Sequence, residues 1–138
     1  MNKTLVIIKP DGVERSLVGR IVSRFEDRGF KIATGRFETI SNELAQKHYG
    51  EHADKPFFGE LVTFITRSPS FVFVLEGPED TWSIVRSMMG KTNPLDSPCG
   101  TIRGDFATEI AENIVHGSDS AESARREIGI FFPDFKLD

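Results

Sequence analysis

Apolar residues follow two spacings along the chain, and the way these spacings alternate predicts strands separated by helices. Residues 5–8 and 70–75 are rich in consecutive β-branched and aromatic side chains, which is typical of strands buried on both faces. Residues 30–39 alternate between apolar and polar positions, and residues 113–116 form a short apolar run. These two segments predict two further strands.

The intervals between these runs carry apolar residues at helical spacing. Val18, Ile21 and Phe25 lie on one face of a predicted helix, and Gly29 favours its C-terminal end. Two further predicted helices are residues 41–49, with Ser41 as N-cap, and residues 56–64. Gly77-Pro78 introduces another helix, in which Trp82, Val85 and Met89 form the buried stripe. A last helix is opened by Asp119–Glu122 and stopped by Gly129.

Two segments are predicted to lack regular structure. Pro10-Asp11-Gly12 is typical of a tight turn, and residues 90–104 contain three glycines and two prolines without apolar periodicity. Long connections of this kind in a compact domain are usually functional or disordered. The order of elements predicts one domain over residues 1–138, an α/β sandwich in which helices cover a ferredoxin-like, four-stranded antiparallel sheet.

The composition narrows the possible ligands and compartments. The chain has 138 residues and a formal charge of −4, and its isoelectric point near 5.4 disfavours stable binding to nucleic acid or to anionic lipid. The single cysteine, Cys99, excludes an internal disulfide and a multi-cysteine zinc site, and it fits a reducing compartment. Because no apolar stretch is long enough for a membrane span or a signal-peptide core, we expect a cytoplasmic protein with no membrane partner.

The common nucleotide-binding and hydrolase motifs are missing, which leaves three histidines as candidate nucleophiles. His48 and His52 lie near a predicted helix end, and a lone histidine is more often structural than catalytic. His116 lies between a predicted strand and a predicted helix. There Gly117 allows a ligand to approach closely, and the helix N-terminus favours an anion.

Three cations could supply the counter-charge for such an anion. Lys9 ends the first strand, Arg86 lies on the polar side of its helix, and Arg103 lies in the glycine-rich segment. Each of them alone is usually a solvated surface charge. If the fold brings them together, they form a clamp for phosphate groups, but the spacing does not decide this.

Four motifs in the same order resemble the nucleoside diphosphate kinase family, and the similarity runs along the whole chain. They are Lys9–Gly12, Thr92–Pro94, Gly100–Phe106 and Asn113–Ser120. The resemblance implies an enzyme that transfers the terminal phosphoryl group of a nucleoside triphosphate, mainly ATP, to a nucleoside diphosphate. It also implies a ping-pong mechanism through a phosphohistidine, with broad specificity for base and sugar.

The resemblance further implies a role for each matching residue. His116 is the phosphorylated histidine, and Glu127 binds its other ring nitrogen. Mg²⁺ is expected to be held by the nucleotide phosphates, without a metal ligand from the protein. The other implied residues are Arg86, Thr92 and Arg103 at the phosphates, Lys9 and Asn113 at the sugar hydroxyls, Phe57 stacked on the base, Tyr49 near the histidine, Ser118 on Glu127, and His52 near a phosphate.

Some questions stay open at this level. The family implies a homo-oligomer, and a dimer, a tetramer and a hexamer are all compatible with the sequence. Cys99 and Lys91 differ from the residues that are common at these positions in the family. The difference at Cys99 affects the rigidity of the loop, and the difference at Lys91 affects the local charge near the phosphates. Two alternative functions are a phosphohistidine relay to a protein acceptor and a non-catalytic ferredoxin-like domain that binds nucleic acid or a protein.

Overall fold

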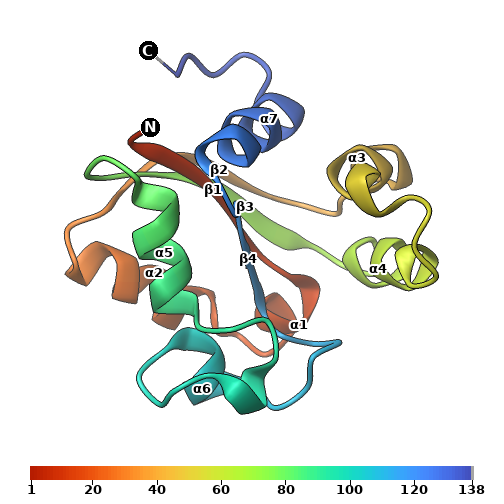
Figure 1. The fold of residues 1–138 in the computed structure, drawn as a ribbon, viewed down its shortest axis with the longest axis horizontal. Coiled ribbons are helices and arrows are strands. Elements are labelled where there is room, and N and C mark those ends of the chain that lie inside the picture. The colour runs from red at the N-terminus through yellow and green to blue at the C-terminus, as the bar shows by residue number, and fades with distance from the viewer. Residues whose placement is uncertain (138) are drawn as a thin grey trace.

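The computed structural model describes residues 1–137, and an antiparallel sheet lies at its centre (Figure 1). In the described residues the sheet has four strands in the order β2-β3-β1-β4, and every neighbouring pair is antiparallel. The ferredoxin-like fold class and four strands are confirmed, but the last strand begins at Val115 rather than at Asn113, because Ile114 adopts a left-handed backbone. The strands are β1 (Lys3–Ile8), β2 (Lys31–Glu38), β3 (Ser70–Glu76) and β4 (Val115–Gly117).

The central strands β1 and β3 are apolar along their length because both of their faces are covered. Successive side chains of a strand point to opposite faces. Leu5 and Ile7 therefore pack into one hydrophobic cluster, while Val6 and Ile8 pack into another, and all four are fully buried. The strand β2 lies at an edge of the sheet, and most of its residues are exposed.

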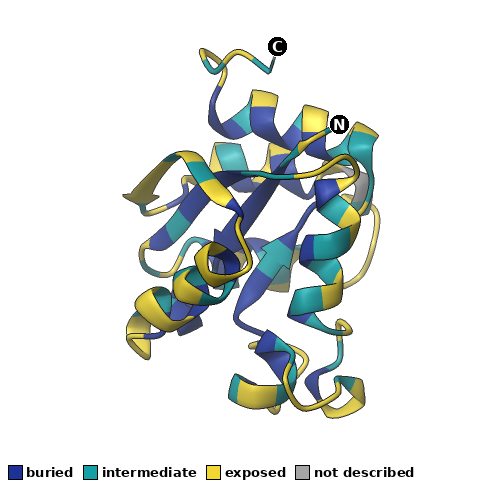
Figure 2. Ribbon diagram, turned by 90° about the vertical axis from the view of Figure 1, so that its left-hand side faces the viewer, coloured by how far each residue is buried: buried dark blue, intermediate teal, exposed yellow. Residues whose placement is uncertain are grey.

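Helices cover both faces of the sheet, and Figure 2 shows that the buried residues gather on the strands and on the helix sides that face them. On one face, Phe25 and Val85 of the covering helices pack into the hydrophobic core, and on the other face Ile65 and Phe131 do so. The first face carries α2 (Val18–Asp27) and α5 (Thr81–Met89), and the second carries α3 (Asn42–His48), α4 (Phe58–Ile65) and α7 (Ala121–Phe131).

Two short helices form where the sequence predicts a tight turn and an irregular loop. One is α1 (Pro10–Glu14), which begins with a proline whose fixed φ suits the first helical turn. The other is α6 (Ile102–Phe106), which Thr101 caps by accepting a hydrogen bond from the backbone N–H of Gly104 at 3.0 Å. Five residues are too few to show apolar periodicity. Short 3₁₀ turns also form at Gly50–His52 (η1) and Pro94–Asp96 (η2).

The helix α5 begins later than the sequence predicts. Asp80 adopts a left-handed backbone with φ of +59°, so the helix starts at Thr81 rather than directly after Pro78. Thr81, Val85 and Met89, spaced by four, form the fully buried row. Trp82 is therefore only partly buried, and its place in the predicted stripe is wrong.

The last helix, α7, differs from the prediction at both ends. Ser120 rather than Asp119 is the N-cap, since its side chain accepts a hydrogen bond from the N–H of Ser123 at 2.9 Å. The helix also continues through Gly129 to Phe131. A glycine inside a helix costs about 1 kcal/mol relative to alanine. Burial of the Phe131 side chain contributes roughly 1.5–3 kcal/mol, which outweighs that cost.

Within residues 1–137, no helix combines the length and the apolar character that a membrane crossing needs.

Because α7 runs past an exposed glycine, Gly129→Ala should raise the free energy of unfolding by about 1 kcal/mol. A Cβ at this position meets no atom within 4 Å, so the added methyl group causes no clash. Phe131→Ala should lower the free energy of unfolding by about 3–5 kcal/mol. Urea unfolding measures both changes, and a destabilised Gly129→Ala protein would mean that the helix ends at residue 129.

Candidate active site

A cavity of about 220 Å³ lies where the end of β1, the strand β4 and the helices α3, α5, α6 and α7 meet. The side chains that line it come from distant parts of the sequence. The cavity therefore brings together the candidate nucleophile and the three cations of the expected phosphate clamp. The lining residues already singled out from the sequence are Lys9, Tyr49, His52, Arg86, Thr92, Arg103, Asn113, His116 and Glu127.

Ser118 and Phe57, the other two residues singled out, lie outside this lining. Ser118 is fully buried, and its hydroxyl donates a hydrogen bond to Glu127 Oε1 at 2.7 Å. Phe57 precedes α4 and is 44% exposed. Its ring centroid lies 5.8 Å from that of His52, so Phe57 borders the cavity through this histidine.

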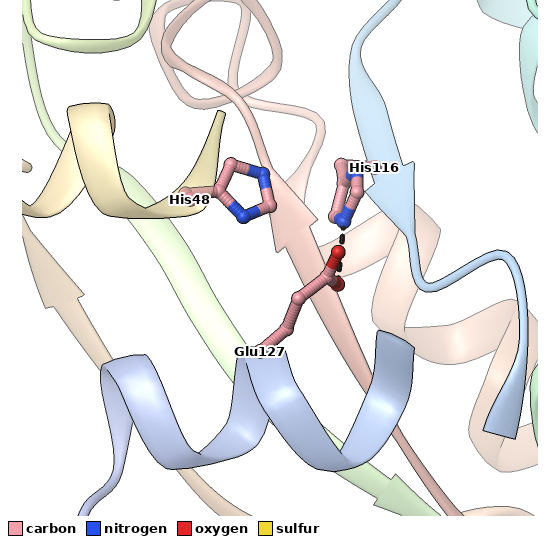
Figure 3. A group of neighbouring side chains, drawn as sticks. All are labelled: His48, His116 and Glu127. Carbon is pink, nitrogen blue, oxygen red and sulfur yellow. Dashed lines mark hydrogen bonds and ion pairs between the residues drawn. The ribbon is translucent and has the colours of Figure 1, made fainter. Parts of the chain in front are cut away.

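The closest pair of functional groups in the cavity is His116 and Glu127 (Figure 3). His116 Nε2 and Glu127 Oε1 are 2.8 Å apart. An ionised carboxylate only accepts hydrogen bonds, so Nε2 donates and carries the ring proton. The lone pair of the neutral ring then lies on Nδ1, the nitrogen that Glu127 does not use.

Glu127 stays ionised although it is buried. Burial alone raises the pKa of a carboxyl group. Here the electrostatic interaction with His116 and the hydrogen bonds from His116 and Ser118 outweigh burial and hold the pKa of Glu127 well below its ordinary value. Near pH 7 the carboxylate is therefore a permanent acceptor for the imidazole.

A strained turn precedes β4 and positions His116. Ile114 has φ of +73°, a left-handed conformation that β-branched residues rarely adopt. Its own N–H donates to Asp11 Oδ2 at 3.1 Å, and its carbonyl accepts from the N–H of Lys9 at 2.7 Å. The N–H of Val115 donates to the carbonyl of Asn113 at 2.8 Å, which closes a γ-turn. This turn places Asn113 and His116 on the same cavity.

Lys9 belongs to a chain of hydrogen bonds along the cavity wall. Its ammonium donates to Asn113 Oδ1 at 2.9 Å, and Asn113 Nδ2 donates to the carbonyl of Thr92 at 2.9 Å. Burial, together with the charge of Arg103, lowers the pKa of Lys9 to about 8. An anion in the cavity stabilises the charged form of this lysine.

The two arginines also bind backbone carbonyls of the cavity wall. Arg103 is buried and donates to the carbonyls of Gly90, Asn113 and Val115 at 3.2, 3.2 and 2.6 Å. Burial and the nearby charge of Arg86 lower its pKa to about 10, so it stays cationic near pH 7. Arg86 donates to the carbonyl of Gly117 at 2.9 Å. Arg103 thus holds the backbone of the cavity wall in place and also gives the wall a positive charge.

His48 lines the cavity, although the sequence assigned it no role. Its ring meets that of His116 edge-on, with centroids 4.5 Å apart, and it also contacts Tyr49 and Phe131. Burial, with a contribution from His116, lowers the pKa of His48 to about 3. Burial also raises the pKa of Tyr49. His48 is therefore neutral near pH 7. Its proximity to His116 is a tertiary contact between α3 and β4, for which the sequence carries no signal.

Asp119 and Arg126 also line the cavity and were not singled out. Asp119 lies within the Asn113–Ser120 motif, and its place in that motif is the sequence signal that indicates a position in the cavity. Within the described lining the carboxylates are Asp119 and Glu127, and Glu127 is engaged by His116 and Ser118. A hard cation such as Mg²⁺ needs several oxygen ligands. The donor set therefore fits a cation that arrives with ligand oxygens of its own.

Comparison with protein-family models matches residues 2–137 to nucleoside diphosphate kinase. The chain belongs to the nucleoside diphosphate kinase family. It is 56% identical to the nucleoside diphosphate kinase of Brevibacillus brevis over 132 residues. The aligned region covers 96% of this chain and 89% of that protein. Its identity to the nucleoside diphosphate kinase of Oceanobacillus iheyensis is 55% over 137 residues, which covers 99% of this chain and 92% of the relative.

Solved structures of this family have the same fold. A halophilic nucleoside diphosphate kinase from Halobacterium salinarum in complex with CDP matches with a TM-score of 0.92 and 47% identity, over 99% of this chain and 92% of that chain. The apo nucleoside diphosphate kinase from Encephalitozoon cuniculi matches with a TM-score of 0.93 and 37% identity, over 97% of this chain and 90% of that one.

Membership of the nucleoside diphosphate kinase family confirms the activity expected from the sequence. The chain is an enzyme that transfers the terminal phosphoryl group of a nucleoside triphosphate to a nucleoside diphosphate by a ping-pong mechanism with a phosphohistidine intermediate. The reaction of the family uses a divalent cation. Neither the non-catalytic binding domain nor the relay to a protein acceptor is favoured.

The neutral, buried His48 should make stability depend on pH. In the unfolded chain a histidine takes up a proton near pH 6.5, whereas in the folded chain the pKa of His48 is about 3. The unfolded state therefore binds more protons between these values, and stability falls as the pH drops, by up to about 1.4 kcal/mol per pH unit. Urea unfolding at pH 7.5, 6 and 5 should show a smaller loss in His48→Phe than in the wild type. Equal losses would contradict a neutral His48.

Proposed function

We propose that His116 is the residue that carries the phosphoryl group, and that Nδ1 is the atom that accepts it. The observation that carries this proposal is the 2.8 Å contact between His116 Nε2 and Glu127 Oε1 inside the cavity. In the first half-reaction the Nδ1 lone pair forms a bond to the terminal phosphorus. The bond from that phosphorus to the bridging oxygen breaks, and the nucleoside diphosphate leaves with the electron pair. The second half-reaction reverses these steps on another nucleoside diphosphate.

Glu127 has two consequences for this reaction. It holds the ring proton on Nε2, so the attacking nitrogen needs no separate base. It also faces the positive charge that the ring gains as the N–P bond forms, and a buried carboxylate stabilises that charge strongly. Ser118 donates to the same carboxylate oxygen and fixes its position.

The cations on the cavity wall suit the phosphates of the nucleotide. Transfer of a phosphoryl group spreads negative charge over its oxygens, and fixed cations stabilise this charge. Arg86, Thr92 and Arg103 are proposed to contact the phosphates, and Lys9 and Asn113 to contact the sugar hydroxyls. The lowered pKa values of Lys9 and Arg103 support these roles, because burial keeps both cations poorly hydrated and the phosphates of a nucleotide would supply a counter-charge.

Phe57 and the residues near it form the outer part of the proposed nucleotide site. Phe57 is exposed and borders the cavity through His52, which suits an aromatic ring on which the base stacks. Every base has a π-face, so stacking gives broad base specificity. His52 is proposed to lie near a phosphate, and Tyr49 packs beside His48 next to the nucleophile.

The divalent cation is proposed to be Mg²⁺ bound mainly to the nucleotide phosphates. Its chemistry is to neutralise phosphate charge. Asp119 lines the same cavity, and its carboxylate adds negative charge there without being needed as a metal ligand. ATP is proposed as the main donor, and nucleoside diphosphates with different bases as acceptors.

We propose further that residues 1–138 act as one catalytic domain, in the cytoplasm and as a homo-oligomer. The edge strand β2 supports self-association. In the described residues it pairs with β3 alone, and its Phe37 is 59% exposed. Exposed edges and apolar side chains of this kind commonly lie at subunit contacts.

The role of His116 can be tested without an acceptor. Incubation with Mg²⁺ and ATP should add one acid-labile phosphoryl group per chain, measured by intact mass, and GDP should then remove it and yield GTP. His116→Ala should take up no label, whereas His52→Ala, which removes another cavity histidine, should still take up one. Full labelling of His116→Ala would contradict the assignment, and a label that GDP does not discharge would favour transfer to a protein acceptor.

Stacking on Phe57 should be insensitive to the base. Phe57→Ala should weaken the binding of ADP, GDP and CDP by similar amounts, roughly 1–3 kcal/mol each, in calorimetric titrations. Ile110→Ala is a matched control, because Ile110 is 60% exposed and does not line the cavity. A loss confined to one base would show that Phe57 is not a general stacking platform.

A further inference from the structure

Three side chains from separate elements converge at the bottom of the cavity. His48 ends α3, His116 lies in β4, and Glu127 lies in α7. One donor atom from each lies within 4.8 Å of the other two. Figure 3 shows the two imidazoles and the carboxylate pointing toward a common centre. The proposed reaction uses His116 and Glu127 but leaves His48 without a task.

His48 is a buried imidazole with neither ring nitrogen satisfied by the described residues. It is only 4% exposed, and neither nitrogen has a hydrogen-bond partner within residues 1–137. A buried polar group without a partner destabilises the fold, because it has lost its hydrogen bonds to water. A ligand that accepts the lone pair of the neutral His48 ring removes part of this destabilisation.

The donor set identifies the chemistry of that ligand. Two imidazole nitrogens and one carboxylate oxygen are the ligands that Zn²⁺ uses in many sites with one open position. Mg²⁺ prefers oxygen ligands and has little affinity for imidazole. All three groups line the cavity, so a metal ion can enter, and water can occupy the fourth position.

We propose that His48, His116 and Glu127 bind one Zn²⁺ ion in the nucleotide-free chain, and that the zinc-bound chain cannot be phosphorylated. When zinc binds, the single ring proton of His116 moves through solvent from Nε2 to Nδ1. Nε2 then binds Zn²⁺ with the lone pair this frees, and the metal separates the nitrogen from Glu127. The Nδ1 lone pair is then no longer available to attack phosphorus. The binding of zinc is independent of the proposed function, whereas the block of phosphorylation rests on it.

Zinc binding is tested first, by calorimetric titration of the nucleotide-free chain with Zn²⁺. The titration uses a Cys99→Ser background, because Cys99 is an exposed free thiol that can bind zinc itself. One zinc per chain is expected. His48→Phe retains an aromatic ring against Tyr49 and Phe131 but removes both nitrogens, and it should bind zinc at least a hundredfold more weakly. His52→Gln removes a cavity histidine outside the trio, and its affinity should stay within about twofold.

Histidine ¹⁵N NMR on the same background gives a readout that needs no substitution in the three proposed ligands. Zinc should shift the ring signals of His48 and His116 and move the proton of His116 to Nδ1, while His52 keeps its signals. The zinc site is overturned if no stoichiometric binding occurs, if binding survives in His48→Phe, or if the signals of His48 do not change. If His48→Phe does not fold, Glu127→Gln replaces it in the titration, with the same expected loss.

The block of phosphorylation is tested with Mg²⁺ and ATP in a zinc buffer that fixes the concentration of free Zn²⁺. Occupied chains should take up no phosphoryl label, and chelation of the zinc should restore it. Labelling of the zinc-bound chain overturns the block and leaves the metal site intact. A zinc-free wild type that is not labelled overturns the proposed role of His116 together with the block, while the titration still decides the metal site.

Discussion

The hydrogen bond between His116 Nε2 and Glu127 is the interaction on which the account of this site depends. It decides which ring nitrogen holds the proton and therefore which one holds the lone pair. The fold maintains it from both sides. The turn at Ile114 starts β4 at the angle that presents His116, and Ser118 holds the carboxylate that α7 supplies. Backbone strain of this kind persists only where the surroundings enforce it, and here Asp11 does so.

An acidic chain can bind a polyanion because its cations are concentrated in one place. Lys9, Arg86 and Arg103 meet in the cavity although they lie far apart in the sequence. Burial lowers the pKa of Lys9 and of Arg103, so part of the free energy of folding is used to hold cations in a poorly hydrated place. The phosphates of a nucleotide supply the missing counter-charge. The site is thus organised before the ligand arrives.

The sequence predicts the parts of the fold that depend on long apolar patterns. The runs in β1 and β3 follow from burial on both faces, and the capping of α3 by Ser41 is also confirmed, with a hydrogen bond from the N–H of Leu44 at 3.1 Å. Short helices such as α1 and α6 have too few residues to show a period. The meeting of Lys9, Arg86 and Arg103 was only a possibility from their spacing, and their proposed roles came from family resemblance. The contact of His48 with His116 depends on tertiary packing, so no local pattern predicts it.

The most direct test of the account is to identify which nitrogen of His116 carries the phosphoryl group. Phosphorylate the ¹⁵N-labelled chain with Mg²⁺ and ATP at alkaline pH, where phosphohistidine survives, and record histidine ¹⁵N and ³¹P NMR spectra. We expect a phosphoryl group on Nδ1, with Nε2 still hydrogen-bonded to Glu127. A phosphoryl group on Nε2 would contradict it, because that atom is the one the carboxylate holds.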